Sequence, residues 1–307
     1  MDMKNTRWLS LMILCTGFLL IVVDMTIVNV ALPSIQRDLR FSQSGLAWVI
    51  NAYLIAFAGF LLLAGRLGDL FGRKRVYLIG LCIFIAASVL CGLSFSQPML
   101  VAARFIQGIG GAVSSAVILA MIVTLFPKQD ELAKAFGVFS FIASAGAAIG
   151  LLAGGFITQA VSWHWIFFVN LPIGIVVAAL SARVLASDRG IGIKEGVDVL
   201  GAVLVTVALM LGVYAIVQSS DSGLGSFRTI GLGALAAAAQ NWALRRNTQA
   251  ERWLWLFAGL LLVFPSLIEG LAETLTGLDV PYPAPFGFAL AAALLLKQKF
   301  VPARLAA

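Results

Sequence analysis

The chain has 307 residues, of which 61% are hydrophobic and 11% are charged, and its formal net charge is +7. A soluble globular protein carries about 25% charged residues, so this composition argues against the soluble class. It predicts an all-α integral membrane protein whose apolar side chains face lipid. The excess of cations does not indicate a nucleic-acid binder, because the cations gather in short segments between apolar runs.

Ten apolar runs follow one another, and about 20 apolar residues suffice for a helix to cross a bilayer. The predicted spans are 8–32, 45–65, 76–95, 99–126, 135–157, 165–186, 197–218, 226–241, 253–268 and 285–296. The last run is short and could instead be a re-entrant or interfacial segment. Lys4 and Arg7 precede the first run, as in a signal peptide. That run is long and has no clear cleavage site, so we expect it to remain a span.

The cations fall mainly on one side of this predicted arrangement. They precede span one, follow span ten, and occupy the connections after spans two, four, six and eight. The segments 94–98 and 158–164 on the other side contain none, although 33–44 holds two arginines and is a mild exception. Because the side rich in Lys and Arg is cytoplasmic, we predict a multi-pass protein of the cytoplasmic (inner) membrane with both termini in the cytoplasm.

Asp24 lies well inside the first predicted span. A charged side chain at the bilayer centre costs about 2.5–3.5 kcal/mol on insertion scales, so it normally faces a cavity or a partner. Desolvation favours the neutral form of a carboxylic acid, which makes Asp24 a candidate proton carrier. The alternative is that Asp24 lies near the interface and reaches water.

Arg104 comes only a few residues into the fourth predicted span. A snorkelling arginine at the interface and an arginine that points into a helix bundle are therefore both compatible with the sequence. Gln107 follows almost one helical turn later and could share a polar network with Arg104.

Residues 65–75 separate the second and third predicted spans and are expected to form a compact loop. Gly65 and Gly72 are placed at its bends, because tight turns need residues that tolerate positive φ. Asp69 and Arg73 could form an ion pair in one conformation and lose it in another. A simple basic anchor of topology is the alternative to a gate, but the glycines and the embedded carboxylate exceed what an anchor requires.

Gly146, Gly150 and Gly154 recur every four residues and so lie on one face of the fifth predicted span. Small residues along one face let two helix backbones approach closely. Plain structural packing and a functional contact face are both compatible with this pattern.

Five segments resemble motifs of the major facilitator superfamily, and in particular of its 14-span drug–proton antiporters. They are, in order, 24–33, 65–75, 104–112, 146–155 and 163–174, and the resemblance covers roughly residues 8–240. Two residues depart from the family pattern. Leu70 stands where an arginine is usual, and Leu151 stands where a proline usually bends span five.

The resemblance implies a six-helix major-facilitator N-terminal bundle plus about four further spans. The bundle would occupy residues 1–190, two linker spans 191–241, and a tail with one or two membrane segments 242–307. In this family the substrate binds between two six-span halves, and no family motif is recognisable after about residue 240. We therefore expect either a homodimer with the glycine face of span five as its contact, or a truncated or chimeric chain that is inactive by itself.

The resemblance further implies proton-coupled efflux of amphipathic, cationic drugs, with protons, these small molecules and membrane lipid as partners. It places proton or substrate binding at Asp24, Asn29, Arg104 and Gln107, a cytoplasmic gate at Gly65, Asp69, Gly72, Arg73 and Lys74, and helix packing at Gly146, Gly150, Gly154 and Gly155. A transport-incompetent membrane protein and an exporter of an anionic metabolite are the alternatives. We expect no enzyme, no cofactor and no metal, because no nucleophile–base pair or cluster of metal ligands is visible.

Overall fold

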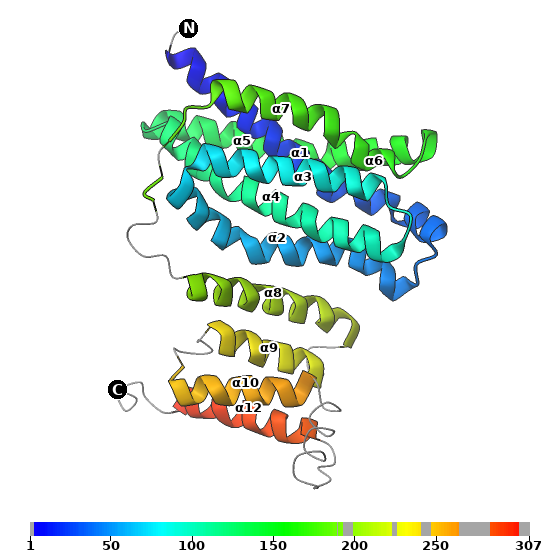
Figure 1. Ribbon diagram of the computed structural model, residues 1–307, viewed down its shortest axis with the longest axis vertical. Coiled ribbons are helices and arrows are strands. Elements are labelled where there is room, and N and C mark those ends of the chain that lie inside the picture. The colour runs from blue at the N-terminus through cyan, green and yellow to red at the C-terminus, as the bar shows by residue number, and fades with distance from the viewer. Residues whose placement is uncertain are drawn as a thin grey trace. The chain divides into compact units, whose positions relative to one another are not determined.

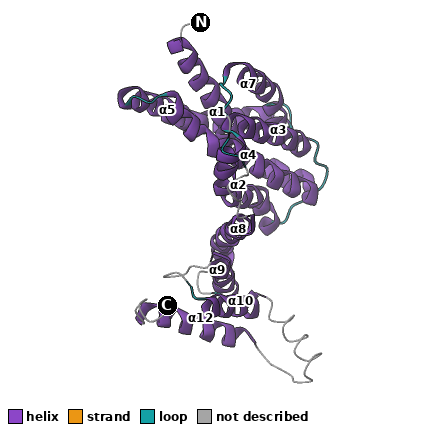
Figure 2. Cartoon of the chain, turned by 60° about the vertical axis from the view of Figure 1, so that its left-hand side comes forward, coloured by secondary structure: helices purple, strands orange, loops and turns teal. Residues whose placement is uncertain are grey.

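The computed structural model describes residues 3–188, 190–192, 199–222, 226–240, 247–263 and 283–300. These residues are almost entirely helical and contain no strand, which confirms the all-α fold (Figure 2). Seven helical segments among them are long and apolar enough to cross a membrane. The chain divides into two compact units, Met1–Val197 and Asp198–Ala307.

The first unit is a helical bundle built around α4 (Figure 1). Its helices are α1 (Met3–Leu39), α2 (Gln43–Phe71), α3 (Arg73–Gly92), α4 (Gln97–Leu125), α5 (Gln129–Ala160), α6 (Trp165–Phe168) and α7 (Asn170–Val184). The helix α4 packs along both α2 and α3, whereas α1 packs along α5 and α7. The helices α1 to α4 and the joined α6 and α7 thus enclose one interior.

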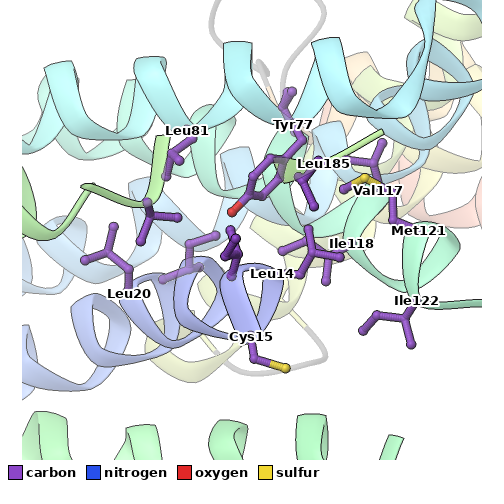
Figure 3. Packing of buried hydrophobic residues seen from close by; sticks show 14 of the residues in the cluster. Leu14, Cys15, Leu20, Tyr77, Leu81, Val117, Ile118, Met121, Ile122 and Leu185 are labelled. Carbon is purple, nitrogen blue, oxygen red and sulfur yellow. The ribbon is translucent and has the colours of Figure 1, made fainter. Parts of the chain in front are cut away.

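Apolar side chains from several helices fill that interior. Figure 3 shows Tyr77 of α3 reaching between Leu14 and Leu20 of α1 and the α4 residues Val117 and Ile118. All of these side chains are buried. Burial of a large apolar side chain stabilises the fold by about 1.5–3 kcal/mol when the alternative is water, and close packing matters in lipid as well.

The prediction of a compact loop over residues 65–75 is wrong, because most of these residues are helical. The helix α2 continues to Phe71 and α3 begins at Arg73, so Gly72 alone makes the turn, with φ of 93°. A positive φ suits glycine because it has no Cβ. Gly65 lies inside α2 and makes no bend; the charged residues around it are tolerated in a helix that has extended past its apolar run.

The predicted homodimer contact on span five is also wrong, because α1 of the same chain covers the glycine face of α5. A Cβ on Gly146 would lie 2.7 Å from Cδ1 of Leu19, and one on Gly154 would lie 2.9 Å from the carbonyl oxygen of Ile27. Gly150 is buried in the same contact, whereas Gly155 lies beside it and is only partly covered. The helix α5 is continuous from Gln129 to Ala160.

The sixth predicted span is present as one segment, Trp165–Val184. It is divided into α6 and α7 only at Val169, which keeps helical dihedral angles (φ −61°, ψ −26°) and whose N–H donates to the carbonyl oxygen of Trp165 at 3.1 Å. Pro172 removes one helical hydrogen bond in this first part of the span, since it has no N–H to donate to the carbonyl of Phe168. Asn170 lies at the first position of α7, two residues before Pro172.

The second unit contains α8 (Val199–Ser222), α9 (Phe227–Gln240), α10 (Gln249–Val263) and α12 (Pro283–Phe300), each packed against the next. Glu251 is fully buried and pairs with Lys297 at 3.0 Å. Among these helices α8 alone has the length and apolarity of a span. The predicted division at residue 241, and residues 264–268 of the predicted span 253–268, lie outside the described residues.

Candidate functional site

Asp24 of α1 lies at the centre of a buried polar network in the first unit, and its carboxylate is fully enclosed. Its Oδ2 accepts a hydrogen bond of 2.7 Å from Nη1 of Arg104 on α4. Its Oδ1 accepts one of 2.8 Å from Nε2 of Gln107 and one of 2.9 Å from Nδ2 of Asn170. Three donors from two other helices therefore hold this carboxylate.

Arg104 is held as firmly as the acid that it pairs with. Its Nε donates to the carbonyl oxygen of Val49 at 3.1 Å, and its Nη1 also donates to Oε1 of Gln107 at 2.6 Å. The guanidinium carbon lies 4.2 Å from the ring centroid of Tyr53, within the range of a cation–π contact. With 1% of its surface exposed, Arg104 points into the bundle and does not snorkel.

Ser88 of α3 completes the network as a shared acceptor. Its Oγ accepts from Nε2 of Gln107 at 2.7 Å and from Nδ2 of Asn170 at 3.3 Å, and it donates to the carbonyl oxygen of Phe84 at 2.9 Å. The thiol of Cys91 lies 3.6 Å from Oε1 of Gln107, close enough for a weak hydrogen bond. Side chains of α1, α3, α4 and α7 thus meet at one point.

The charges of the network balance, because the Asp24 carboxylate and the Arg104 guanidinium compensate each other. A buried ion pair needs this balance, together with further hydrogen bonds, to offset the loss of hydration. Any event that neutralises Asp24 therefore leaves an uncompensated cation inside the bundle.

The residues that the sequence singled out meet here only in part. Asp24, Arg104 and Gln107 come together, but Asn29 is exposed and its Nδ2 donates to the carbonyl of Met25 on its own helix at 3.0 Å. Ser88 and Asn170 were not among the predicted site residues. An amide inside the apolar run 165–186 was a signal for Asn170, whereas a single serine in a span gives none.

A second polar cluster joins α2, α3 and α4 at the turn made by Gly72. The Arg73 guanidinium donates to Asp69 at 3.3 Å, to Oγ1 of Thr124 at 2.8 Å and to the carbonyl oxygen of Ala120 at 3.4 Å. The predicted pairing of Asp69 with Arg73 is therefore present, as an i,i+4 pair across the turn. On geometry alone this cluster can fasten three helix ends together.

Asp188, which the sequence did not single out, fastens a fourth element to this turn. Its carboxylate accepts from the backbone N–H groups of Arg73 at 2.8 Å and Lys74 at 3.2 Å, which caps α3. Burial by itself raises the pKa of Asp188, but those hydrogen bonds and the charge of Arg73 outweigh it and lower the pKa below its ordinary value.

Lys74 makes the reciprocal contact with the end of α7. Its Nζ donates to the carbonyl oxygen of Ala182 at 2.8 Å and to that of Leu185 at 2.6 Å. Carbonyl groups at a helix C-terminus lack helical partners, and a cation suits the dipole there. The segment after α7 also pairs with α2 through the N–H of Ile191, which donates to the carbonyl oxygen of Asp69 at 2.9 Å.

The two clusters lie on the same helices. Arg73 and Ser88 are 15 residues apart on α3, which corresponds to about 22 Å along a helix. In the described part of the chain, no group of three or more His, Cys, Asp or Glu side chains has the arrangement of a metal site.

Sequence comparison identifies relatives of this chain. The profile of the Major Facilitator Superfamily matches residues 14–297, which extends past residue 240 into the part where no motif was recognised. The chain is 42% identical over 236 residues to the puromycin resistance protein pur8 of Streptomyces alboniger, covering 76% of this chain and 46% of that protein.

Two further relatives carry names of the same kind. The multidrug resistance protein Stp of Mycobacterium tuberculosis is 36% identical over 258 residues, which cover 83% of this chain and 48% of Stp. The cephamycin export protein CmcT of Amycolatopsis lactamdurans is 40% identical over 225 residues, which cover 72% of this chain and 46% of CmcT. The matched region spans about half the length of these relatives. The chain is a multi-pass membrane protein that belongs to the major facilitator superfamily.

Proposed function

We propose that the chain takes part in proton-coupled efflux of amphipathic, cationic drugs across the cytoplasmic membrane. The observation that carries this proposal is the enclosed carboxylate of Asp24, paired with Arg104 in the interior of the bundle. Among the described residues of the first unit, Asp24 is the one acid that is fully buried. Intramembrane acids in such positions typically belong to ion or substrate pathways.

The chemistry of the network supports an exchange of cations. A proton or a cationic drug that reaches Asp24 would neutralise the same carboxylate, so the two would compete for one site. Competition of this kind couples the uptake of a proton to the release of a drug, because occupancy by one excludes the other. The names of the relatives, which refer to resistance and to export, agree with a drug as the exported molecule.

Export of an anionic metabolite is the second candidate, since Arg104 could bind an anion. The contacts of Arg104 favour the first candidate. Its guanidinium is already engaged by Asp24, Gln107 and the carbonyl of Val49, so an anion would have to displace a buried carboxylate. A protonated Asp24 would be needed before an anion could bind there.

The test is the efflux of ethidium, a fluorescent cation, from proteoliposomes that contain the purified full chain under an imposed pH gradient. We expect efflux driven by the gradient with the natural sequence, and its loss in Asp24→Asn, because an amide cannot take up a proton. Asp130→Asn is the matched control, since this acid is exposed in the first turn of α5. Unchanged efflux in Asp24→Asn, or efflux of organic anions in its place, would contradict the proposal.

A further inference from the structure

The hydrogen bonds of Asp24 share one property: every partner is a donor. Arg104 supplies one N–H to Oδ2, while Gln107 and Asn170 supply one each to Oδ1. These contacts suit a carboxylate, which only accepts hydrogen bonds. A protonated carboxylic acid has an O–H of its own and needs an acceptor, which none of these N–H groups can provide. Protonation of Asp24 therefore requires one of the three partners to move.

Arg104 and Gln107 are each fixed by other contacts. Arg104 is also bonded to the carbonyl of Val49 and lies over the ring of Tyr53. The amide of Gln107 is fixed in orientation, because its oxygen accepts from Arg104 while its nitrogen donates to Asp24 and to Ser88. Rotation of the Gln107 amide would bring N–H groups together and break its hydrogen bonds to Arg104, Asp24 and Ser88.

Asn170 is held less firmly than these two. Apart from Asp24, its Nδ2 has one partner, Ser88, at 3.3 Å. Within the described part of the chain its amide oxygen accepts no hydrogen bond, so this oxygen is available. Asn170 also lies two residues before Pro172, in the turn where the carbonyl of Phe168 lacks a helical N–H partner. Rotation of this amide would present its oxygen to a newly formed O–H on Asp24.

We propose that Asn170 is the positioning residue that responds to the charge of Asp24. Its amide donates to the carboxylate and, after protonation, turns so that it accepts from the carboxylic acid. The helical hydrogen bond that Pro172 cannot make leaves span six easier to bend next to Asn170, so this change can reach the rest of the span. The inference deepens the proposed function, because it rests on uptake of a proton by Asp24.

The other charged or titratable groups around Asp24 do not supply such a response. Arg104 of α4 keeps its charge in proteins and can only donate. The hydroxyl of Tyr53 on α2 makes no hydrogen bond among the described residues, and the thiol of Cys91 on α3 is directed to Gln107 rather than to Asp24. Ser88 is neutral, and α7 contributes Asn170 itself.

Infrared difference spectroscopy of the purified full chain in lipid tests this role without any transport assay. The carbonyl stretch of protonated Asp24 is followed against pH and assigned by its loss in Asp24→Asn. In Asn170→Leu, which keeps the branching at Cγ and removes the amide, we expect the pH midpoint of this band to rise by about one unit. A hydrogen bond to a charged acceptor is stronger than one to a neutral group, so its loss favours the proton about tenfold.

Two controls separate this role from simple packing. Asn170→Gln, which restores an amide, should recover most of the shift, and Asn29→Leu should leave the midpoint unchanged because that amide bonds only to its own helix. In the natural sequence an asparagine carbonyl band should also titrate together with Asp24, and this measurement does not require an Asn170 variant to fold.

The outcomes distinguish the inference from the proposed function. An Asp24 band that titrates while the asparagine band stays constant would overturn the role of Asn170 and leave proton coupling intact. An equal midpoint in Asn170→Leu and the natural sequence would overturn it too. If Asp24 never protonates in the accessible pH range, both the inference and the proton-coupled mechanism fail.

Discussion

Asp24 and Arg104 form an ion pair in which neither side chain has appreciable contact with solvent. Removing one partner of such a pair leaves a buried charge without compensation, which typically costs about 3–5 kcal/mol, whereas removing both charges together is often close to neutral. The effect on stability of changing either residue therefore depends strongly on the other, although the two are 80 positions apart in the chain.

We expect Arg104→Gln to lower the stability of the bundle by about 3–5 kcal/mol, because it leaves the carboxylate of Asp24 unpaired. The double variant Asp24→Asn/Arg104→Gln should regain most of this loss, since no net charge then remains buried. Thermal unfolding of the detergent-purified protein measures both effects. A double variant no more stable than Arg104→Gln would mean that the pair contributes through shape rather than charge.

At the scale of residues, the sequence predicts charged site residues better than neutral ones. Asp24 and Arg104 were recognisable because a charge in an apolar span needs a partner. Ser88 gave no signal, and the amide of Asn170 in an apolar run did not show its partners, because neutral polar residues are tolerated on many faces of a span and their partners depend on how the helices pack. Asn29 shows the converse, since its motif placed it at the site and its helix face places it outside.

At the scale of elements, hydrogen bonds join the N-terminus of α3 to the C-terminus of α7 and to the segment that follows it. Asp188, from the segment after α7, caps the start of α3, and Lys74, from the start of α3, bonds the last carbonyls of α7. Each helix end thus satisfies the orphan backbone groups of the other. Arg73, which pairs with Asp69, is held by its backbone in the same contact.

In Asp188→Ala the first amides of α3 lose their acceptor. We expect hydrogen exchange at Arg73 and Lys74 to become about two- to tenfold faster, in line with the loss of a helix cap. Asp130→Ala, in the first turn of α5, is the matched control and should leave α3 unaffected. Equal protection of α3 in both variants would show that Asp188 does not hold this turn.

The direction in which folding shifts the pKa of Asp188 determines how this contact depends on pH. The folded state lowers the pKa of Asp188, so the contribution of the cap is complete above the ordinary pKa of an aspartate, about 4, and decreases as the pH falls through the folded value. Acid should therefore loosen α3 in the natural sequence and have less effect in Asp188→Ala.

At this scale the sequence predicted the helices but not all of their ends. Apolar runs located every described helix, because the apolar content of a span is a direct requirement of lipid. They could not show that α2 would continue through charged residues to Phe71, since charges are compatible with a helix once it leaves the membrane. The four-residue spacing of the α5 glycines likewise could not show that α1 would pack against them.

At the scale of the whole molecule, the first unit presents one six-span bundle, and in this family the substrate lies between two six-span halves. The outer side of α5 exposes large apolar side chains, including Phe141, Leu152 and Phe156. If a second copy supplies the opposing bundle, the detergent-purified particle should contain two chains and have a protein mass twice the 32.5 kDa of one chain. Light scattering with a correction for detergent measures this mass. A particle of one chain that still exports ethidium would contradict a second copy as the opposing bundle.

The contacts at the turn made by Gly72 also bear on which end of the bundle faces the cytoplasm. The turn at Gly72 lies at the same end of the bundle as the C-termini of α4 and α7, because Arg73 bonds Thr124 and Lys74 bonds Leu185. That end carries most of the cations of the first unit, which favours the cytoplasm. The sequence predicted this orientation from charge alone.

Cysteine labelling from either side of the membrane tests this orientation. We expect a cysteine at Gln129, in the first turn of α5, to react with an impermeant maleimide only from the cytoplasmic side. A cysteine at Ser96, between α3 and α4, should react only from the opposite side. The background should replace the three natural cysteines, since Cys82 is exposed on α3. Labelling of Ser96 from the cytoplasm would invert the bundle, and the cluster of Asp69 and Arg73 could then no longer be a cytoplasmic gate.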